Sequence, residues 1–183
     1  MQDKVRFIGL DVHKETIMIA IAESQGGEPF VLKQIPNDPQ RLLKELRKVR
    51  KGCELKVCYE AGPTGFGLQR LLMKMKIDCI IVAPSLIPVR SGERIKTDRR
   101  DACKLAHFLR SGDLTAIWIP DEQTESMRDL ERSREDARLA ERTARQQLLK
   151  FLLRHDRKFT EGKSNWTQIH WAWIRKQTFE QPA

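Results

Sequence analysis

The sequence predicts an α/β protein in which a mixed β-sheet is flanked by helices and followed by a long helical arm. Three observations favour this class. Short apolar runs joined by polar turns fill residues 5–36, and strand patterns then alternate with amphipathic helix patterns as far as residue 84. Residues 122–157 contain neither Gly nor Pro and carry apolar side chains spaced by three and four, which is typical of a long helix.

The N-terminal elements are predicted to be hairpin-linked strands. Residues 5–10 are mostly apolar, and TIMIAIA at 16–22 is apolar and rich in β-branched residues. The intervening DVHKE is typical of a short polar turn. Gly26, Gly27 and Pro29 then mark a further turn before FVLKQI, which we expect to form a third strand.

The next stretch predicts parallel strands joined by helical crossovers. In DPQRLLKELRKVRKG, apolar residues at helical spacing and a final Gly52 indicate an amphipathic helix. The strand ELKVCYE, the break AGPTG, the helix GLQRLLMKM and the strand IDCIIVAP follow in that order. The sheet should therefore be antiparallel first and parallel later.

The segment before the next helix is predicted to be a loop. Residues 86–97 carry Pro88, Gly92 and several basic side chains without periodicity, and Thr97 is a candidate N-cap. The helix should run from about Asp98 to Leu109 and end at SGD.

The long arm has the spacing of a coiled coil, although its seam is imperfect. Arg134 and Glu141 interrupt the apolar positions, so the pattern only partly supports pairing with another helix. The apolar positions are Met127, Leu130, Ala137, Ala144, Leu148 and Phe151.

Composition limits the partners and the location. The 183 residues include 34 Lys and Arg against 25 Asp and Glu, for a formal net charge of +9, which favours a polyanion such as nucleic acid or an anionic surface. The four cysteines lack CxxC spacing, so we expect neither a disulfide framework nor a zinc ribbon. Charges and prolines interrupt the apolar runs, so we expect a cytoplasmic protein with no membrane partner.

Four carboxylates lie at the ends of predicted core elements. Asp11 follows the first strand, Glu60 follows a later one, and Asp98 and Asp101 share one face of a helix start. Singly, each has a structural explanation: a hairpin turn, a solvent-facing strand end, or compensation of the helix dipole. Jointly, they have the arrangement of an RNase H-like nuclease, in which converging carboxylates hold the divalent cations of phosphoryl transfer.

Three stretches resemble the N-terminal domain of the DEDD insertion-sequence transposases, the group that contains the DNA invertase Piv and the bridge-RNA-guided recombinases. They are FIGLDVHKETIMIAIAE, CYEAGPTGFGLQRLL and VAPSLIPVRSGERIKTDRRDACKLAHFLRSGDL, and the resemblance covers nearly the whole chain. It implies a RuvC-like RNase H fold and DNA strand exchange during transposition. It also implies a tetrad at Asp11, Glu60, Asp98 and Asp101 that holds Mg²⁺, or alternatively Mn²⁺.

The resemblance further implies a C-terminal domain that supplies an attacking serine, which we expect this chain to lack. The expected organisation is a RuvC-like catalytic domain at 1–120, a long helix at 121–160, and a helical tail at 161–183 that leads toward the absent domain. The expected function is that of a truncated transposase or recombinase whose strand cleavage is incomplete alone. The alternatives are a stand-alone RuvC-like nuclease acting on branched DNA, and a non-catalytic nucleic-acid-binding or assembly module.

Basic residues surround the last two aspartates of the predicted tetrad. Beside a metal site we expect them to contact DNA phosphates, although a solvated loop and helix face is the simpler structural explanation. These residues are Arg90, Arg94, Lys96, Arg99 and Arg100. The resemblance makes a guide RNA a second candidate partner, and the long helix is expected to join copies of the chain in a homo-oligomer.

The tail carries aromatic residues at helical spacing. Trp166, Ile169, His170 and Trp173 share one predicted face, and Trp171 lies off it. Such aromatics could stack on bases. Packing of a helix on this domain or on the absent one is the preferred interpretation, because apolar residues at this spacing usually pack.

Overall fold

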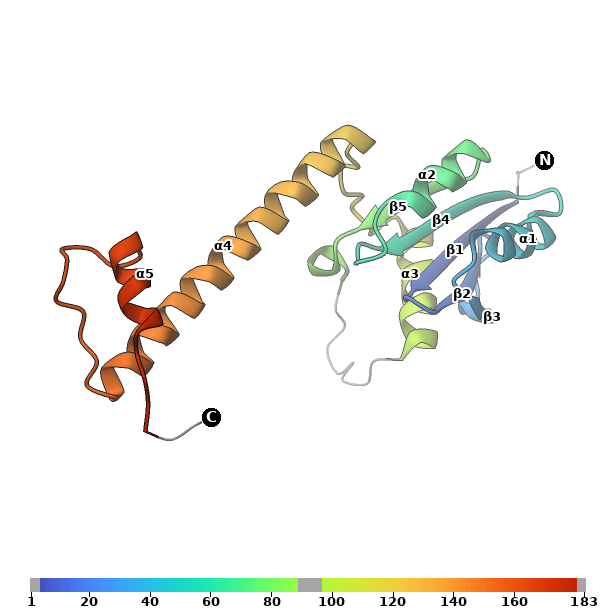
Figure 1. The fold of residues 1–183 in the computed structure, drawn as a ribbon. Helices are drawn as coiled ribbons and strands as arrows, with labels where there is room; N and C mark the ends of the chain where they lie inside the picture. The colour runs from blue at the N-terminus through green and yellow to red at the C-terminus, as the bar shows by residue number, and fades with distance from the viewer. Residues whose placement is uncertain (1–3, 89–96, 181–183) are drawn as a thin grey trace. The chain divides into compact units, whose positions relative to one another are not determined.

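A computed structural model of the chain describes residues 4–88 and 97–180. Contacts divide the chain into two compact units, Met1–Ile119 and Pro120–Ala183 (Figure 1). Within the described residues, the first unit holds a five-stranded sheet with helices, and the second unit is helical. The elements of the first unit are β1 (Val5–Val12), β2 (Thr16–Glu23), β3 (Phe30–Pro36), α1 (Pro39–Arg50), β4 (Glu54–Glu60), α2 (Gly67–Lys74), β5 (Asp78–Val82), a 3₁₀ turn (Pro84–Leu86) and α3 (Asp98–Ser111).

The sheet is mixed, as the sequence predicts. Its strand order is β3-β2-β1-β4-β5. β1 pairs antiparallel with β2, and β2 pairs antiparallel with β3, whereas β1, β4 and β5 run parallel. Short polar turns suffice for the antiparallel part, and helical crossovers connect the parallel part. The predicted α/β class with an RNase H-like mixed sheet is confirmed.

Both faces of β2 are buried, and alternate side chains along the strand pack against different helices. Its odd-numbered residues from 17 to 21, all isoleucine, belong to the cluster that holds the buried side chains of α1 and α2. Its even-numbered residues from 18 to 22 pack with Ala102 and Ala106 of α3. The sheet is therefore covered by α1 and α2 on one face and by α3 on the other (Figure 1).

Gly9 allows α3 to lie directly on β1. A Cβ atom on Gly9 would overlap the carbonyl oxygen of Ala102 and would lie 2.5 Å from the backbone nitrogen of Ala106. On the neighbouring strand, the Cys58 thiol lies 3.5 Å from the carbonyl oxygen of Leu105, also in α3. These contacts fix the helix over the two central parallel strands.

The ends of α3 follow from its terminal residues. The Thr97 hydroxyl accepts a hydrogen bond from the backbone N–H of Arg100 at 3.3 Å, so the predicted N-cap is confirmed. The helix ends at Ser111 rather than at the predicted Leu109, because Gly112 is the first residue to adopt a left-handed conformation, with φ of +81°.

The second unit is dominated by α4 (Glu122–Arg154), a helix of 33 residues. The Asp121 carboxylate caps it by accepting from the N–H of Thr124 at 2.7 Å. Most of its side chains are exposed, including Met127 and Leu130 on the predicted seam. The helix ends at Arg154, before residue 157, where the sequence predicts its end.

None of the described helices is both long enough and apolar enough to cross a membrane.

The tail packs within the second unit around a buried histidine. α5 (Gln168–Arg175) presents His170, whose ring contacts Phe159, Trp166 and Trp173. Its Nδ1 accepts the backbone N–H of Trp166 at 2.9 Å, and burial lowers the pKa of the imidazole. Ile169, which belongs to the same predicted face, is 57% exposed, so only part of that face packs within the described residues.

Candidate metal centre

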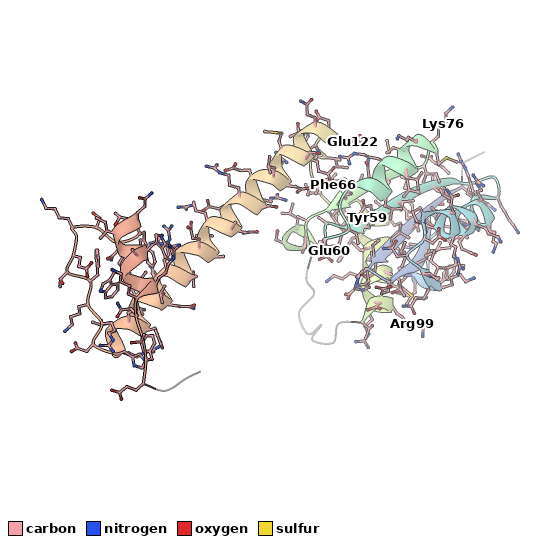
Figure 2. All side chains as sticks on the ribbon, in the orientation of Figure 1. Tyr59, Glu60, Phe66, Lys76, Arg99 and Glu122 are labelled. Carbon is pink, nitrogen blue, oxygen red and sulfur yellow. The ribbon has the colours of Figure 1, made fainter. Side chains whose placement is uncertain are left out.

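The register of the sheet places two of the predicted carboxylates side by side at the C-terminal ends of β1 and β4. Leu10 of β1 lies opposite Tyr59 of the parallel strand β4, and the next residue of each strand is Asp11 and Glu60. Side chains alternate along a strand, so both carboxylates project to the face opposite Leu10 and Tyr59, which is the face that α3 covers. Figure 2 shows Glu60 beside Tyr59 at the end of β4.

α3 brings a third carboxylate to the same place. Asp98 precedes Ala102 by one helical turn, and Asp11 follows Gly9 by two strand residues, so the Gly9–Ala102 contact aligns the two carboxylates. His13 joins them: its Nε2 lies 3.1 Å from Asp11 Oδ2 and 3.5 Å from Asp98 Oδ1. The ligand atoms of Asp11, His13 and Asp98 all lie within 4.8 Å of one another.

Burial and neighbouring negative charges raise the pKa of Asp11. Its side chain is only 16% exposed, and this burial is the largest of the effects that raise the pKa of the carboxyl. The charges of Asp98 and Asp101 raise this pKa further, whereas His13 lowers it. A bound cation would offset both the cost of burying a charged carboxylate and the repulsion between carboxylates, because it favours the charged form of every carboxylate around it.

The structure gathers the predicted tetrad only in part. Asp11 and Asp98 belong to the three-residue group around His13, and Asp101 is near enough to act on Asp11 through its charge. Glu60 is half-buried at the same sheet edge. Among the described residues, neither Glu60 nor Asp101 has a carboxylate oxygen within the 4.8 Å group.

His13 is the member of this group that the sequence predictions did not include. The signal that could have identified it is its spacing from Asp11: residues two apart on an extended strand share a face. The chain turns immediately afterwards, since the His13 N–H donates to the Thr16 carbonyl oxygen at 2.8 Å. The imidazole therefore stays beside the carboxylates and does not continue along the sheet.

Two of the five predicted phosphate contacts lie in the described part of the chain. Arg99 and Arg100 are exposed in the first turn of α3, next to Asp98, and Figure 2 shows Arg99 at the start of this helix. Arg90, Arg94 and Lys96 lie outside the described residues. The first turn of α3 thus presents carboxylates and guanidinium groups side by side.

The donor set of this centre fits a hard divalent cation. Carboxylate oxygens are preferred ligands of Mg²⁺ and Mn²⁺, and an imidazole nitrogen suits Mn²⁺ better than Mg²⁺. Asp11, His13 and Asp98 could hold such an ion together, and Asp101 is near enough to act on Asp11 through its charge. Glu60 follows Tyr59, the strand partner of Leu10, at the end of the neighbouring strand.

Two solved structures show a weak similarity to this chain, with low TM-scores and low sequence identity. The complex of T. thermophilus RuvC with a Holliday junction substrate has a TM-score of 0.39 and 12% identity, covering 63% of this chain and 100% of that one. The large terminase nuclease from the thermophilic phage G20c has a TM-score of 0.37 and 16% identity, covering 68% of this chain and 62% of that one.

Sequence relatives are much closer. A Sinorhizobium fredii protein that carries the transposase name y4qE is 45% identical over 179 residues, which are 97% of this chain and 46% of that protein. The transposase for insertion sequence element IS1533 of Leptospira borgpetersenii is 40% identical over 181 residues, 98% of this chain and 52% of that protein. The chain therefore spans about half the length of the curated relatives it matches.

A family model described as a transposase, that of the IS110-type DEDD transposases, matches residues 8–155. The matched range includes all four predicted tetrad positions and His13. It also covers most of the chain. The chain therefore belongs to the IS110-type DEDD transposase family.

Proposed function

We propose that the first unit is the metal-binding part of a transposase that cleaves and exchanges DNA strands. One observation carries the proposal: Asp11 of β1 and Asp98 of α3, far apart in the sequence, converge on His13 at one edge of the sheet. A protein that needed only a folded core would gain nothing from placing like charges in this partly buried position. A bound cation would supply the missing compensation.

The carboxylates have the metal-binding role in this proposal. Asp11, Glu60, Asp98 and Asp101 would hold Mg²⁺ or Mn²⁺, which supplies Lewis-acid stabilisation of the charge that develops on phosphate oxygens. Asp11 is held by the core strand β1, and Asp98 is held by the capped start of α3, so the carboxylates keep a defined position.

The basic residues have the DNA-binding role. Arg99 and Arg100 would bind backbone phosphates beside the metal, together with Arg90, Arg94 and Lys96 from the preceding segment. Guanidinium groups bind phosphate oxygens in a bidentate manner, which positions a strand without reading its sequence. The net charge of +9 supports this role, and binding should weaken as the salt concentration rises.

Complete strand exchange is proposed to require more than these 183 residues. The relatives are about twice as long, so the remainder of such a protein would supply the attacking group. We further propose a homo-oligomer that pairs through α4, where Met127 and Leu130 are exposed, and a guide RNA as an additional partner. A protein that acts on cellular DNA in this way would be cytoplasmic.

The first experiment measures metal binding to the whole chain by calorimetry and by the electron paramagnetic resonance signal of Mn²⁺. Asp11→Asn and Glu60→Gln should each weaken binding at least tenfold, because each removes a charged ligand. Asp78→Asn is the matched control, since Asp78 is exposed at the start of β5, at the opposite edge of the parallel strands. Wild-type affinity in Asp11→Asn would refute the proposed site.

The second experiment incubates the chain with supercoiled and branched DNA in Mg²⁺ or Mn²⁺. DNA binding with little or no cleavage is expected of an incomplete transposase. Efficient hydrolysis of branched DNA that Asp11→Asn abolishes would instead identify a stand-alone nuclease. DNA binding without cleavage, in a wild-type chain that also binds neither Mg²⁺ nor Mn²⁺ in the first experiment, would identify a binding or assembly module.

A further inference from the structure

A second charged site lies in the second unit, where α4 meets the segment that carries Trp166. It is a pocket of about 380 Å³, which is large enough for a group the size of a nucleotide. The polar lining comes from three successive turns of α4, and the indole of Trp166 forms an apolar wall. The lining residues that matter here are Arg138, Glu141, Arg142, Arg145, Gln146 and Trp166.

Arg142 is the available cation of this pocket. Arg145 forms an ion pair with Glu141, with 2.6 Å between Nη2 and Oε1, and places its guanidinium 5.1 Å from the centre of the Trp166 ring. Arg138 makes two hydrogen bonds to Glu135, at 2.7 and 2.8 Å. Among the described residues, Arg142 has neither an ion pair nor a hydrogen bond through its side chain, although it is exposed and adjoins the same cavity. An anionic group would give it a partner.

The wall of the pocket is held in a strained but fixed position. Trp166 has a φ of +68°, a left-handed conformation that is costly for a bulky residue. Its backbone N–H donates to the Nδ1 of the buried His170, and Arg145 covers its ring. The indole is therefore placed before any ligand arrives, which reduces the entropy lost on binding.

The surrounding charge favours a polyanion. Residues 137–158 hold seven basic side chains and two acidic ones, Glu141 and Asp156. The preceding residues 121–136 hold seven acidic side chains and three basic ones, so positive charge is concentrated on the part of the arm that contains the pocket. Such a region raises the local concentration of an anionic strand and its association rate.

We infer that this pocket binds the phosphodiester backbone of a single-stranded nucleic acid. Arg142 donates to a phosphate, Gln146 offers further hydrogen bonds, and Trp166 contacts the attached sugar or base. A single strand is specified because the pocket accepts one nucleotide-sized group against an aromatic wall, whereas the bases of a duplex are stacked on one another. DNA and RNA share this backbone chemistry. The site is separate from the carboxylate centre and needs no metal.

The test uses the whole chain and fluorescence anisotropy with two labelled 12-nucleotide strands, one DNA and one RNA of matching sequence, in EDTA. Arg142→Gln should weaken binding about five- to tenfold on either strand. It should also make the slope of log affinity against log salt shallower by about 0.7, the contribution of one phosphate contact on a single strand. Arg142→Lys should recover part of the affinity, because it restores the charge without the bidentate geometry.

The matched control is Arg132→Gln, which removes the same charge from an exposed position of α4 outside the pocket. An equal loss of affinity in Arg132→Gln would overturn the inference, as would wild-type affinity and slope in Arg142→Gln. Trp166→Phe should keep the salt slope and lose affinity, since it changes the wall and not the cation. The measurement is made in EDTA and does not depend on the metal centre, so failure here is distinct from failure of that centre.

A stronger effect on the RNA strand would assign the pocket to RNA, because only RNA offers a 2′-hydroxyl to Gln146. Equal effects on both strands would assign it to the shared phosphate backbone. Both outcomes support a nucleic-acid site on the arm.

Discussion

Gly9 of β1 and Ala102 of α3 meet backbone to backbone, with no room for a side chain between them. This contact determines how closely α3 approaches the sheet. It also determines where Asp98 lies relative to Asp11, because each aspartate is only one turn or two strand residues away from the contact. A glycine outside the candidate centre thus controls the geometry within it.

Gly9→Ala should therefore perturb both stability and metal binding. The added methyl group would overlap the Ala102 carbonyl oxygen, and moving α3 to accommodate it should cost about 1–3 kcal/mol of unfolding free energy. The same movement should separate Asp98 from Asp11 and weaken Mn²⁺ binding. Urea denaturation and calorimetry measure the two effects.

Gly67→Ala is the control for this substitution, because a Cβ on Gly67 would meet nothing within 4 Å. It should leave both measurements near the wild-type values. Full metal affinity in a folded Gly9→Ala protein would mean that the position of α3 does not govern the site.

Asp98→Asn and Asp101→Asn should weaken Mg²⁺ and Mn²⁺ binding while the fold persists. Each substitution removes a charge that acts on Asp11 and, in the proposed tetrad, a ligand. The fold should lose only about 0.3–1 kcal/mol, the usual value of a carboxylate near a helix N-terminus. Calorimetric metal affinities unchanged in both variants would contradict the tetrad assignment.

His13→Ala should change which metal the chain prefers. The imidazole contacts both Asp11 and Asp98, and a nitrogen ligand favours Mn²⁺ over Mg²⁺. We expect the variant to lose about tenfold in Mn²⁺ affinity and less in Mg²⁺ affinity, so that the ratio of the two falls. Competition between the two ions, followed by the Mn²⁺ signal, measures this ratio.

Lys14→Ala is the neighbouring control for His13, since Lys14 is 93% exposed and pairs only with Glu15 among the described residues. A ratio that is the same in His13→Ala and Lys14→Ala would exclude the imidazole from the ligand set.

The second unit should lose stability in mild acid because of His170. Burial lowers the pKa of this histidine below its ordinary 6.5, so the unfolded chain takes up a proton at a higher pH than the folded unit does. The contribution of neutral His170 to the unfolding free energy is then fully present above about pH 6.5 and is lost as the pH drops below this value. Thermal melts followed by tryptophan fluorescence at pH 7.5 and pH 5 measure the loss.

His170→Gln supplies the comparison, because glutamine does not titrate and its side-chain oxygen could still accept the Trp166 N–H. The variant should show a smaller difference in melting temperature between the two pH values than the wild type. Equal differences would assign the acid sensitivity to other groups.

The elements of the first unit could be predicted because their signals are local. The apolar run TIMIAIA, rich in β-branched residues, predicts a strand. The structure explains its unusual apolarity, because the isoleucines face one layer of helices while Met18, Ala20 and Ala22 face the other. Thr97 predicts the start of α3 because its hydroxyl can accept a hydrogen bond from a backbone N–H of the first turn, that of Arg100. Both signals depend on residues within a few positions of one another.

The candidate centre could be predicted only as a set of carboxylates, because its geometry depends on distant contacts. The register that sets Leu10 opposite Tyr59, and the contact between Gly9 and Ala102, involve residues that no local pattern relates. His13 was missed for this reason, since its role depends on Asp98. The exposure of Ile169 was missed because helical spacing gives a face but not what covers it.

The order in which the ribosome makes the chain determines when α3 can pack on β1. The ribosome delivers Asp11 early and Asp98 only after the five strands of the sheet have been made. A nascent chain therefore has no assembled carboxylate centre until α3 emerges and docks on Gly9. Any ion binding by the candidate centre would therefore be confined to molecules in which α3 has been translated and has packed on the sheet.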